Sequence, residues 1–415
     1  MEADILKNLR HNYLYNLLDG GFFGFALGFA SFITVLPLFV STYTNSAILI
    51  GLVPAIHNMG WQLPQLLIAN RVSQQSRFKP MLMRFTIQER IPFLAIAIVA
   101  WMSPRLGAQL TLAMIFLLLI WQGLAGGFSA SPWQSMIAKI FPSDRRGTFY
   151  GSQSSAANFL ASISAIMAGF ILGRVGSPLD FTLCFIFASL FMGVSWLALA
   201  QTREPERTLL PPTREPREFW QSIANILKRD VNFRWFLVVR MLSQLAIMGF
   251  SFYTVYAVRS LGMSEIAVGI LTGVLMGTAI IANPVMGWIG DHWSHRLLMA
   301  IGVLSASASA LIAWLAPSPI WFYPVFMLAG IANVAVWTIS LAMIPDFSSE
   351  ADRPSYIGLA NTLIAPVTIL APLLGGWLAE AGGYQTTFIA SAVGGVLTSF
   401  ILVVFVKDPH QEIAT

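Results

Sequence analysis

The stretch Arg146–Phe181, RGTFYGSQSSAANFLASISAIMAGFILGRVGSPLDF, decides the fold because a second copy stands at Arg353–Phe388, RPSYIGLANTLIAPVTILAPLLGGWLAEAGGYQTTF. Both copies are apolar over enough residues to cross a bilayer as a helix. Five landmarks recur 207 residues apart (353 − 146): Arg146 and Arg353, Gly151 and Gly358, Gly169 and Gly376, Gly176 and Gly383, Phe181 and Phe388. Ser46 and Ser264 match at a separation of 218 residues (264 − 46). A duplicated half in a hydrophobic chain is typical of transporters in which one repeat moves against the other.

The composition is that of a membrane protein. Hydrophobic residues make up 56% of the chain and charged residues 10%, whereas about 25% charged residues are usual in soluble domains. The one cysteine, Cys184, excludes an intrachain disulfide and a metal site built from cysteines. No GxxxxGK[ST] loop, Ser-His-Asp set or catalytic carboxylate pair is visible. The sequence therefore predicts no enzyme, no ATP-driven transport, no cofactor and no metal site.

Apolar runs of about twenty residues, the length that crosses a bilayer as a helix, predict twelve transmembrane helices. The runs fall at 13–41, 46–69, 80–102, 108–140, 148–173, 180–200, 232–258, 264–290, 296–316, 320–345, 355–380 and 384–406. The expected fold is an all-α membrane protein with a central cavity. It consists of two pseudo-symmetric six-helix bundles, residues 1–200 and 232–415, joined by a linker, 201–231.

The basic residues predict how these helices are oriented. Apart from those within the first or last few residues of a span, three of the 24 Lys and Arg residues lie within predicted spans: Arg84, Arg90 and Arg240. If the N-terminus is cytoplasmic, three lie in outer loops and the remaining eighteen (24 − 6) on the inner side. This positive-inside bias predicts a multi-pass protein of the plasma (inner) membrane with both termini cytoplasmic. It also explains the net charge of +5 without a nucleic-acid partner.

The linker contains one amphipathic segment. After the charged stretch 202–217, apolar side chains recur at helical spacing: Phe219, Trp220, Ile223, Ile226 and Leu227. Two interpretations are open. The helix lies on the inner membrane surface, or it packs on the rest of the protein. Neither interpretation implies chemistry.

Four short sequences carry a family resemblance. After the eighth span, GWIGDHWSHR (287–296) has a glycine, an acid four residues later and a basic end. Its first-half counterpart, ANRVSQQSRFKP (69–80), has Asn70 where the acid is usual. FPSDRRG (141–147) and LLGGW (373–377) match the fourth-to-fifth loop and the eleventh helix. With the two repeats and the long central linker, the chain resembles the major facilitator superfamily over almost its whole length. The resemblance implies transport by alternating access.

The loop signatures imply a cytoplasmic gate at the helix ends, with these candidates: Asn70, Arg71, Arg146, Asp291, Arg296 and Arg353. We expect Asp291 to pair with Arg296 or Arg353, in a contact that breaks when a repeat moves. The second-half gate should be the tighter one because Asn70 replaces the acid in the first half. The alternative is a set of solvated helix ends, where exposed ion pairs contribute only about 0–1 kcal/mol.

Ionisable side chains inside a span cost about 2.5–3.5 kcal/mol each and usually have a partner or a function. Equal depth on the antiparallel second and third spans predicts one buried polar network that could carry protons. Its candidates are His57, Gln62, Arg84, Gln88, Glu89 and Arg90. Asp19 could join at the level of Arg84. Two interpretations stay open for Glu89 and Arg90: a structural ion pair, or proton carriage by Glu89.

In the resembling family, helices 1, 4, 7 and 10 line the cavity. Their polar and aromatic candidates here are Asn16, Asp19, Trp121, Gln122, Arg240, Gln244, Asn333 and Trp337. Arg240 lies about nine residues inside the seventh span, with no acid on the same helix. Three roles are open for Arg240: a salt bridge with Asp19, a contact to an anionic substrate group, or a side chain that reaches the inner interface.

The sequence leaves three functions open. The first is proton-coupled export of a small amphiphilic organic solute, because the cavity candidates are apolar and aromatic with few polar anchors. The chain lacks the charge in the fourth span and the Gly-Pro in the fifth that drug:proton antiporters commonly carry. The alternatives are a metabolite uptake symporter or uniporter, and a transport-dead membrane sensor or scaffold. The expected partners are a small-molecule substrate, the lipid bilayer and protons, and the expected state is a monomer.

Overall fold

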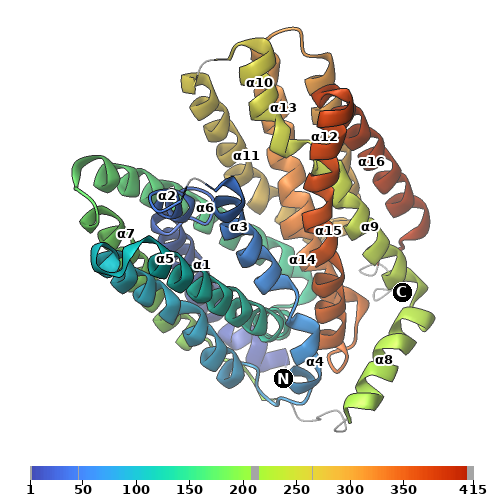
Figure 1. The fold of residues 1–415 in the computed structure, drawn as a ribbon. Helices are drawn as coiled ribbons and strands as arrows, with labels where there is room; N and C mark the ends of the chain where they lie inside the picture. Colours follow the sequence, from blue (N-terminus) through green and yellow to red (C-terminus); the bar gives the residue numbers. More distant parts are fainter. Residues whose placement is uncertain (1, 45, 207–214, 264, 409–415) are drawn as a thin grey trace. The chain divides into compact units, whose positions relative to one another are not determined.

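The computed structural model describes residues 2–44, 46–206, 215–263 and 265–408, and Figure 1 draws its helices. Every regular element in these ranges is a helix. Nine of the helices in the described ranges are long and apolar enough to cross a membrane. The predicted all-α membrane fold is therefore confirmed, whereas the number of twelve spans stays a prediction.

The first half of the chain consists of long helices with short connections. Their bounds are α1 Glu2–Phe29, α2 Val35–Ser41, α3 Ala47–Gln62, α4 Gln65–Ser73, α5 Lys79–Ile140, the 3₁₀ turn η1 Ser143–Arg145, α6 Arg146–Arg174 and α7 Leu179–Ala200. The linker contributes α8, Pro216–Arg229.

The second half follows the same plan. Its helices are α9 Val231–Ile247, α10 Phe250–Leu261, α11 Glu265–His292, α12 His295–Leu315, η2 Pro319–Trp321, α13 Phe322–Val334, the π-helix η3 Ala335–Ile339, α14 Ser340–Met343, η4 Ile344–Phe347, α15 Arg353–Gly382 and α16 Tyr384–Phe405.

The first span is interrupted at the same relative place as the seventh. Between α1 and α2, the Ser31 hydroxyl accepts hydrogen bonds from the backbone N–H groups of Ile33 and Thr34, each at 3.2 Å. In the second half, the interruption falls between α9 and α10. The two interruptions begin at residues 30 and 248, which are 218 residues apart (248 − 30). The repeat seen in the sequence therefore extends to the irregular backbone.

α5 contains two predicted spans, 80–102 and 108–140, in one element. The backbone is non-helical at Gly107, with φ 74° and ψ 167°. Glycine adopts this positive φ without the steric cost that a Cβ atom brings. The kink at Gly107 therefore separates the two predicted spans.

The helices pack into two compact units. The first contains the described residues of Met1–Pro142, Ala156–Thr213 and Glu350–Thr362, and the second those of Ser143–Ser155, Arg214–Ser349 and Leu363–Thr415. Each unit thus includes one exchanged segment from the other repeat: Ser143–Ser155, at the start of α6, and Glu350–Thr362, at the start of α15. The predicted division at 1–200, 201–231 and 232–415 stays a prediction, and residues 207–214 of the linker lie outside the described residues.

Aromatic side chains fill the core of each unit. Phe29, Phe93 and Phe185 are fully buried among α1, α5 and α7 in the first unit. In the second unit, Tyr253 on α10 and Phe388 on α16 are buried in the core. Burial of such large rings is a main source of core stability.

The linker helix α8 packs against α9. Phe219 and Ile223 on its apolar face are buried, whereas Trp220 is exposed. A capping box of Glu215 and Glu218 fixes its start. Burial of the apolar face supports the second of the two interpretations given above for this segment, packing on the protein.

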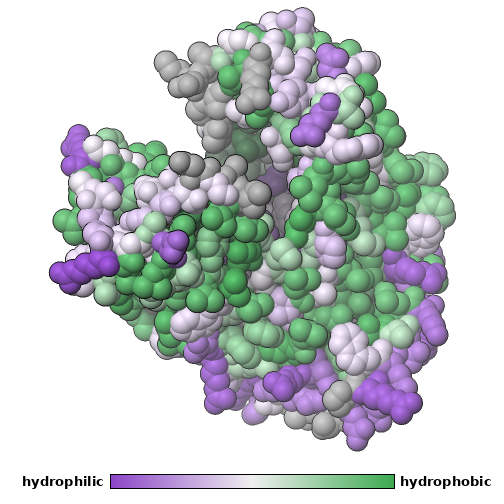
Figure 2. All heavy atoms as spheres, in the orientation of Figure 1, coloured by the Kyte–Doolittle hydropathy of each residue, from purple (hydrophilic) through white to green (hydrophobic). Residues whose placement is uncertain are grey.

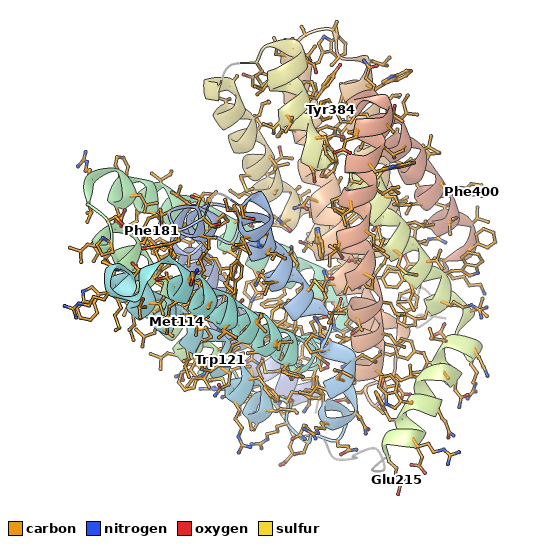
Figure 3. The ribbon with its side chains drawn as sticks, viewed as in Figure 1. Met114, Trp121, Phe181, Glu215, Tyr384 and Phe400 are labelled. Carbon is orange, nitrogen blue, oxygen red and sulfur yellow. The ribbon has the colours of Figure 1, made fainter. Side chains whose placement is uncertain are left out.

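Figure 2 shows apolar side chains over the sides of the helices and hydrophilic ones gathered near the helix ends. Large apolar side chains such as Leu117, Phe400 and Trp377 are exposed, and Figure 3 labels Phe400 on α16. Exposed apolar surface of this extent suits contact with lipid.

Candidate functional site

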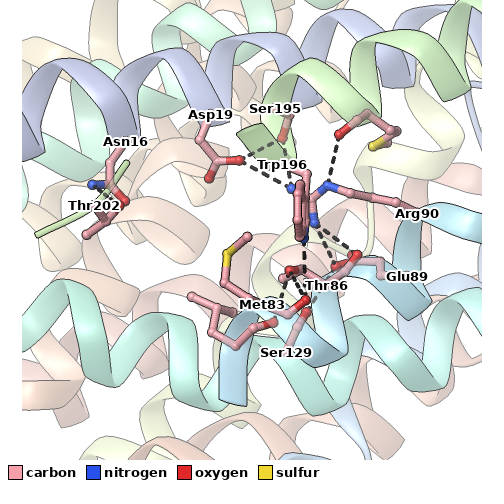
Figure 4. Close-up of polar contacts among 12 residues, drawn as sticks. Asn16, Asp19, Met83, Thr86, Glu89, Arg90, Ser129, Ser195, Trp196 and Thr202 are labelled. Atoms are coloured by element: carbon pink, nitrogen blue, oxygen red, sulfur yellow. Dashed lines mark hydrogen bonds and ion pairs between the residues drawn. The ribbon is translucent and has the colours of Figure 1, made fainter. Parts of the chain in front are cut away.

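A cluster of three charged side chains lies inside the first unit (Figure 4). Asp19 comes from α1, and Glu89 and Arg90 come from α5; the three residues are 6%, 6% and 7% exposed. Two carboxylates therefore share one guanidinium in a buried, membrane-embedded part of the protein. We call these three residues the charge cluster.

Arg90 is held on several sides. Its Nη2 lies 3.2 Å from Oδ1 of Asp19 and donates to the Ser195 hydroxyl at 2.8 Å. The Ser195 hydroxyl in turn donates to the same Oδ1 at 2.6 Å. Arg90 Nε donates to the carbonyl of Met192, and Nη1 donates to the carbonyl of Thr86. These contacts form a closed triangle of Arg90, Asp19 and Ser195, and they fix the guanidinium against α7.

Glu89 is held less closely. Its Oε2 lies 4.0 Å from Arg90 Nη1 and accepts a hydrogen bond from the Ser129 hydroxyl at 3.0 Å. A Cβ atom at Gly126 would lie 2.9 Å from Oε1, so glycine leaves room for the carboxylate. Asp19 therefore has the nearer cation and the shorter hydrogen bond of the two acids.

Asp19 and Arg240 lie in different units. Asp19 contacts Arg90 and Ser195 in the first unit. Arg240 is buried on α9 in the second unit, and its three possible roles stay predictions. Asp19 was expected at the level of Arg84, and it lies instead with Arg90, six residues (90 − 84) further along the third span.

The predicted polar network is only partly present. His57 Nδ1 lies 3.0 Å from Oε1 of Gln122, and the His57 ring stacks on Phe32 with centroids 3.7 Å apart. Gln62 is buried. Arg84 and Gln88 are exposed and therefore do not belong to a buried network. The physical reason is the helical period: these two residues are four apart on one face of α5, and the buried Glu89 and Arg90 lie on another.

The first-unit cavity candidates differ in their surroundings. Asn16 Nδ2 donates to the Thr202 hydroxyl at 3.1 Å and to the carbonyl of Asn12 at 2.8 Å. Asn16 thus contacts the start of the linker. Trp121 is 40% exposed on α5, and Figure 3 labels it there. Its neighbour Gln122 is buried and bonds to His57.

The second-unit candidates lie on α9 and on the α13–η3 span. Arg240 and Gln244 are buried one turn apart. Asn333 is exposed, and Trp337 is half-buried in the π-helix η3. Short π-helical segments are frequent at functional sites. These positions stay predictions for substrate contact.

The exchanged segment Ser143–Ser155 forms a charged contact with α11 inside the second unit. Both oxygens of Asp291 accept backbone hydrogen bonds at the start of α6, from Gly147 at 2.7 Å and from Thr148 at 2.6 Å. Arg146 Nη1 lies 2.8 Å from Oδ1 of Asp346. A carboxylate at a helix N-terminus is favoured by the unpaired N–H groups and by the helix dipole. We call these five residues the charged interlock.

The charged interlock corrects the predicted partners of Asp291. In the described part of the chain, Asp291 contacts Gly147, Thr148 and His295, whose Nε2 is 3.5 Å away. Arg296 instead donates to the carbonyl of Val406 at 2.8 Å. The structure therefore does not form the predicted pairing of Asp291 with Arg296, and the pairing with Arg353, which lies in the first unit, stays a prediction.

Glycines allow the close approach that the charged interlock needs. A Cβ atom at Gly147 would lie 2.7 Å from the carbonyl oxygen of Gly287. One at Gly151 would overlap the carbonyl of Asn283. The backbones of α6 and α11 therefore meet directly at these two points.

The exchanged segment Glu350–Thr362 makes the corresponding contact inside the first unit. Asn361 Nδ2 donates to Oε1 of Gln65 at 2.7 Å. The Thr362 hydroxyl accepts from the N–H of Leu66 at 3.2 Å and donates to the carbonyl of Leu63 at 3.1 Å. We call Leu63, Gln65, Leu66, Asn361 and Thr362 the neutral interlock, since its amide, hydroxyl and backbone groups carry no charge.

Sequence reasoning missed the neutral interlock, although a signal was available. Thr362 matches Ser155 at the repeat offset (362 − 155 = 207). The Ser155 hydroxyl donates to the carbonyl of Ile280 at 2.6 Å, so both hydroxyls bond to a neighbouring span. Comparison of the two copies position by position would have identified the pair.

Asn70, Arg71 and Arg353 are the remaining gate candidates. Arg71 is exposed, and Asn70 Oδ1 accepts from Gln74 Nε2 at 3.4 Å. Arg353, in the second exchanged segment, is buried.

The first unit contains a further buried ion pair, which sequence reasoning also missed. Lys139 Nζ lies 3.0 Å from Oε1 of Glu204, and each side chain is 1% exposed. The same carboxylate accepts from the N–H groups of Phe78 at 2.9 Å and Lys79 at 2.7 Å. Glu204 thus caps the start of α5 and binds its far end.

Comparison with known protein families agrees with this architecture. The family model described as Major Facilitator Superfamily matches residues 20–258 and 240–415. Multidrug resistance protein 1 of Bacillus subtilis is 25% identical over 154 residues, which cover 37% of this chain and 39% of that protein. Quinolone resistance protein NorA of Staphylococcus aureus is 24% identical over 158 residues, with the same coverage of 37% and 39%. The alignments thus span about two-fifths of the length of these relatives.

Solved structures show the same fold over nearly the whole chain. A variant of the E. coli fucose:proton symporter FucP has a TM-score of 0.76 and 14% identity, covering 95% of this chain and all (100%) of that one. The human organic anion transporter MFSD10 (TETRAN) has a TM-score of 0.73 and 13% identity, with coverage of 95% and 98%. These matched proteins are transporters rather than enzymes. Since the family model covers most of its length, the chain belongs to the Major Facilitator Superfamily of membrane transporters.

Proposed function

We propose that this protein exports a small amphiphilic organic solute across the plasma (inner) membrane in exchange for protons. The single observation that carries the proton coupling is the charge cluster, in which Asp19 and Glu89 share Arg90. No other basic side chain contacts either carboxylate in the part of the chain that the structure describes.

Charge balance makes one of these carboxylates a proton carrier. With both acids ionised, the cluster has a net charge of −1 in a buried site, where an uncompensated charge costs several kcal/mol. With one acid protonated, the cluster is neutral. A group that gains and loses one proton as its surroundings change is what a proton-coupled transporter requires.

Glu89 is the better carrier of the two acids. Asp19 lies 3.2 Å from Arg90 and accepts a hydrogen bond from Ser195 at 2.6 Å. Glu89 lies 4.0 Å from Arg90. A nearby cation and a donated hydrogen bond both favour the ionised form of an acid. Asp19 therefore stays ionised, and the exchangeable proton resides on Glu89.

The two interlocks support alternating access. Each joins residues of both sequence repeats: Asp291 with Gly147 in the second unit, and Gln65 with Asn361 in the first. Hydrogen bonds of this kind contribute about 0.5–3 kcal/mol net, so a conformational change can break them. The positive-inside charge pattern supports a cytoplasmic position for both interlocks and for both termini.

The substrate class is inferred from the span that contains Trp121. Between Gln109 and Met136 the chain has no charged residue. Arg240 and Gln244 on α9 add a few polar groups to an otherwise apolar set of candidates. The similarity to two proteins named for multidrug and quinolone resistance supports an amphiphilic solute. A monomer is the proposed transporting state.

Transport into proteoliposomes with an imposed pH gradient tests the proposal, with the lipophilic cation ethidium as the probe. We expect the wild-type protein to accumulate ethidium inside the vesicles only when the vesicle interior is the more acidic compartment, because protons then leave as ethidium enters, and we expect Glu89→Gln to lose this dependence. Glu206→Gln removes an exposed carboxylate and serves as the matched control, with transport unchanged. Equal accumulation with and without the gradient in the wild type would overturn the proposal. Gradient-driven transport of sugars or organic acids but not of ethidium would favour metabolite uptake.

A further inference from the structure

We infer that two serine hydroxyls, Ser195 and Ser129, determine which carboxylate of the charge cluster holds the proton. Ser195 keeps Asp19 ionised, and Ser129 allows Glu89 to be protonated and deprotonated. This inference rests on the proposed proton coupling and names the residues that direct it. Both serines act as positioning residues, because neither exchanges the proton itself.

The Ser195 hydroxyl donates its proton to one acceptor, Oδ1 of Asp19. Its oxygen already accepts from Arg90 Nη2 at 2.8 Å, and its O–H donates to Oδ1 of Asp19 at 2.6 Å. Protonation of Asp19 on Oδ1 would remove the acceptor of both Ser195 and Arg90, and protonation on Oδ2 would remove the charge that strengthens both bonds at Oδ1. Loss of one buried partner typically costs about 1–3 kcal/mol. The geometry therefore opposes protonation of Asp19.

The hydroxyl of Ser129 has two acceptors in reach. Its Oγ lies 3.0 Å from Oε2 of Glu89 and 2.9 Å from the carbonyl oxygen of Gly126. When Glu89 is ionised, the Ser129 O–H donates to the carboxylate. When Glu89 is protonated, its own O–H donates to the Ser129 oxygen, and the Ser129 O–H turns to Gly126. Every donor has an acceptor in both states.

Among the described residues, no third carboxylate contacts the charge cluster. α1 contributes Asp19, α5 contributes Glu89 and Arg90, and α7 contributes Ser195 and the carbonyl of Met192. α3, which also packs on α5, contributes His57, whose Nδ1 bonds to Gln122. The ring of Phe23 lies 5.4 Å from the Arg90 guanidinium and covers its remaining side. The two serines are therefore the polar groups that distinguish the environments of the two acids.

Infrared difference spectroscopy during pH titration separates the two acids, because a protonated carboxylic acid has its own C=O stretching band. The experiment uses the full-length protein in lipid nanodiscs. We expect the wild type to show one such band from the cluster, which Glu89→Gln removes and Asp19→Asn leaves. In Ser195→Ala, a second band should appear that persists in Glu89→Gln and disappears in Asp19→Asn. Ser195→Thr, which keeps the hydroxyl, should restore the wild-type spectrum.

Ser129→Ala provides an independent measurement if Ser195→Ala does not fold. The Glu89 carboxylate then loses a donated hydrogen bond, and we expect its proton affinity to rise roughly tenfold, measured as the titration midpoint of its band. A wild-type band that survives Glu89→Gln and is lost in Asp19→Asn would overturn the inference, as would an unchanged midpoint in Ser129→Ala.

The proposed function and this inference fail in different measurements. If wild-type transport ignores the pH gradient, the proposed proton coupling is wrong whichever residue gives the band. If transport follows the gradient and the band belongs to Asp19, only the assignment to the two serines is wrong.

Discussion

The charged and the neutral interlock occupy matching places in the two repeats but use different chemistry. In the second unit, the Asp291 carboxylate accepts from two backbone N–H groups at the start of α6. In the first unit, Asn361 and Thr362 at the start of α15 bond to Gln65, Leu63 and Leu66. One duplicated contact has therefore become dependent on charge, and the other has not.

Both partners of the Asp291–Gly147 contact are replaced in the other copy of the repeat. Asn70 stands in the first half where Asp291 stands in the second. The residue that matches Gly147 is Pro354 (354 − 207 = 147), and proline has no backbone N–H. The acceptor has lost its charge and one donor is missing in the same copy.

A second pair of matching charged residues also has different partners in the two units. Asp346, which pairs with Arg146, matches Lys139 at the repeat offset (346 − 207 = 139). Lys139 pairs with Glu204, beyond the end of α7. Lys139 therefore joins the end of its span to the linker, whereas the matching Asp346 joins the end of its span to the exchanged segment.

The Arg146–Asp346 pair should show the largest effect. Asp346→Asn removes the charge from a buried pair and leaves Arg146 buried, which we expect to cost about 3 kcal/mol of unfolding free energy. Thermal unfolding in detergent measures the loss as a lower Tm. Glu206→Gln, which breaks the exposed pair with Arg77, is the control and should change stability by less than about 1 kcal/mol. Equal Tm values for the two variants would contradict the charged interlock.

Asp291→Asn should cause the second-largest loss of stability. The amide side chain of this variant keeps one acceptor oxygen, but its NH₂ group faces the second backbone N–H donor. We therefore expect the free energy of unfolding to fall by about 2 kcal/mol. The variant should also favour the cytoplasm-open state. Alkylation of a single cysteine introduced at Thr148 measures that opening, and faster labelling is expected. Unchanged labelling and Tm would show that the contact does not hold the segment.

The fold and the gate region could be predicted because both depend on repeated residue types. The 207-residue offset predicted the repeat, and the acid in GWIGDHWSHR predicted that Asp291 matters. The partners of Asp291 could not be predicted, because backbone N–H groups at the start of α6 carry no residue-type signal. The neutral interlock was available from the same offset and was missed because its residues are uncharged.

The matched hydroxyls should show equal or smaller effects. Ser155→Ala removes one hydroxyl bond to the carbonyl of Ile280, whereas Thr362→Val removes the bond to the carbonyl of Leu63 and also the acceptor of the Leu66 N–H. We expect Ser155→Ala to lose about 1 kcal/mol of unfolding free energy and Thr362→Val about 2 kcal/mol, measured as Tm shifts. A clearly larger loss in Ser155→Ala would show that the charged interlock depends on this bond more than its neutral counterpart does.

The smallest change in stability is expected when the acid is restored at Asn70. Asn70→Asp restores the acid, but Pro354 offers no N–H, so we expect stability to change by less than about 1 kcal/mol. Asn70→Asp combined with Pro354→Gly restores both partners and should be more stable than either single variant. A double-variant cycle measures this coupling. Simple additivity of the two changes would contradict the view that they diverged as a unit.

The charge cluster shows where sequence reasoning reached its limit. Equal depth placed Arg84 and Gln88 with Glu89, although the helical period separates their faces, so this error was avoidable. The Asp19–Arg90 pair was not predictable, because it depends on how far α1 extends before its interruption at residue 30. Ser129 and Ser195 carry no sequence signal of their role.

Proton release on ligand binding would show whether Glu89 holds the exchangeable proton. Ethidium is added to the purified protein in a weakly buffered detergent solution that contains a pH-sensitive dye. We expect the wild type to release about one proton per bound ethidium, because a single exchangeable proton resides in the cluster, and we expect Glu89→Gln to bind ethidium without release. Equal release from both proteins would contradict the assignment of the exchangeable proton to Glu89, and binding without release in the wild type would contradict proton exchange itself.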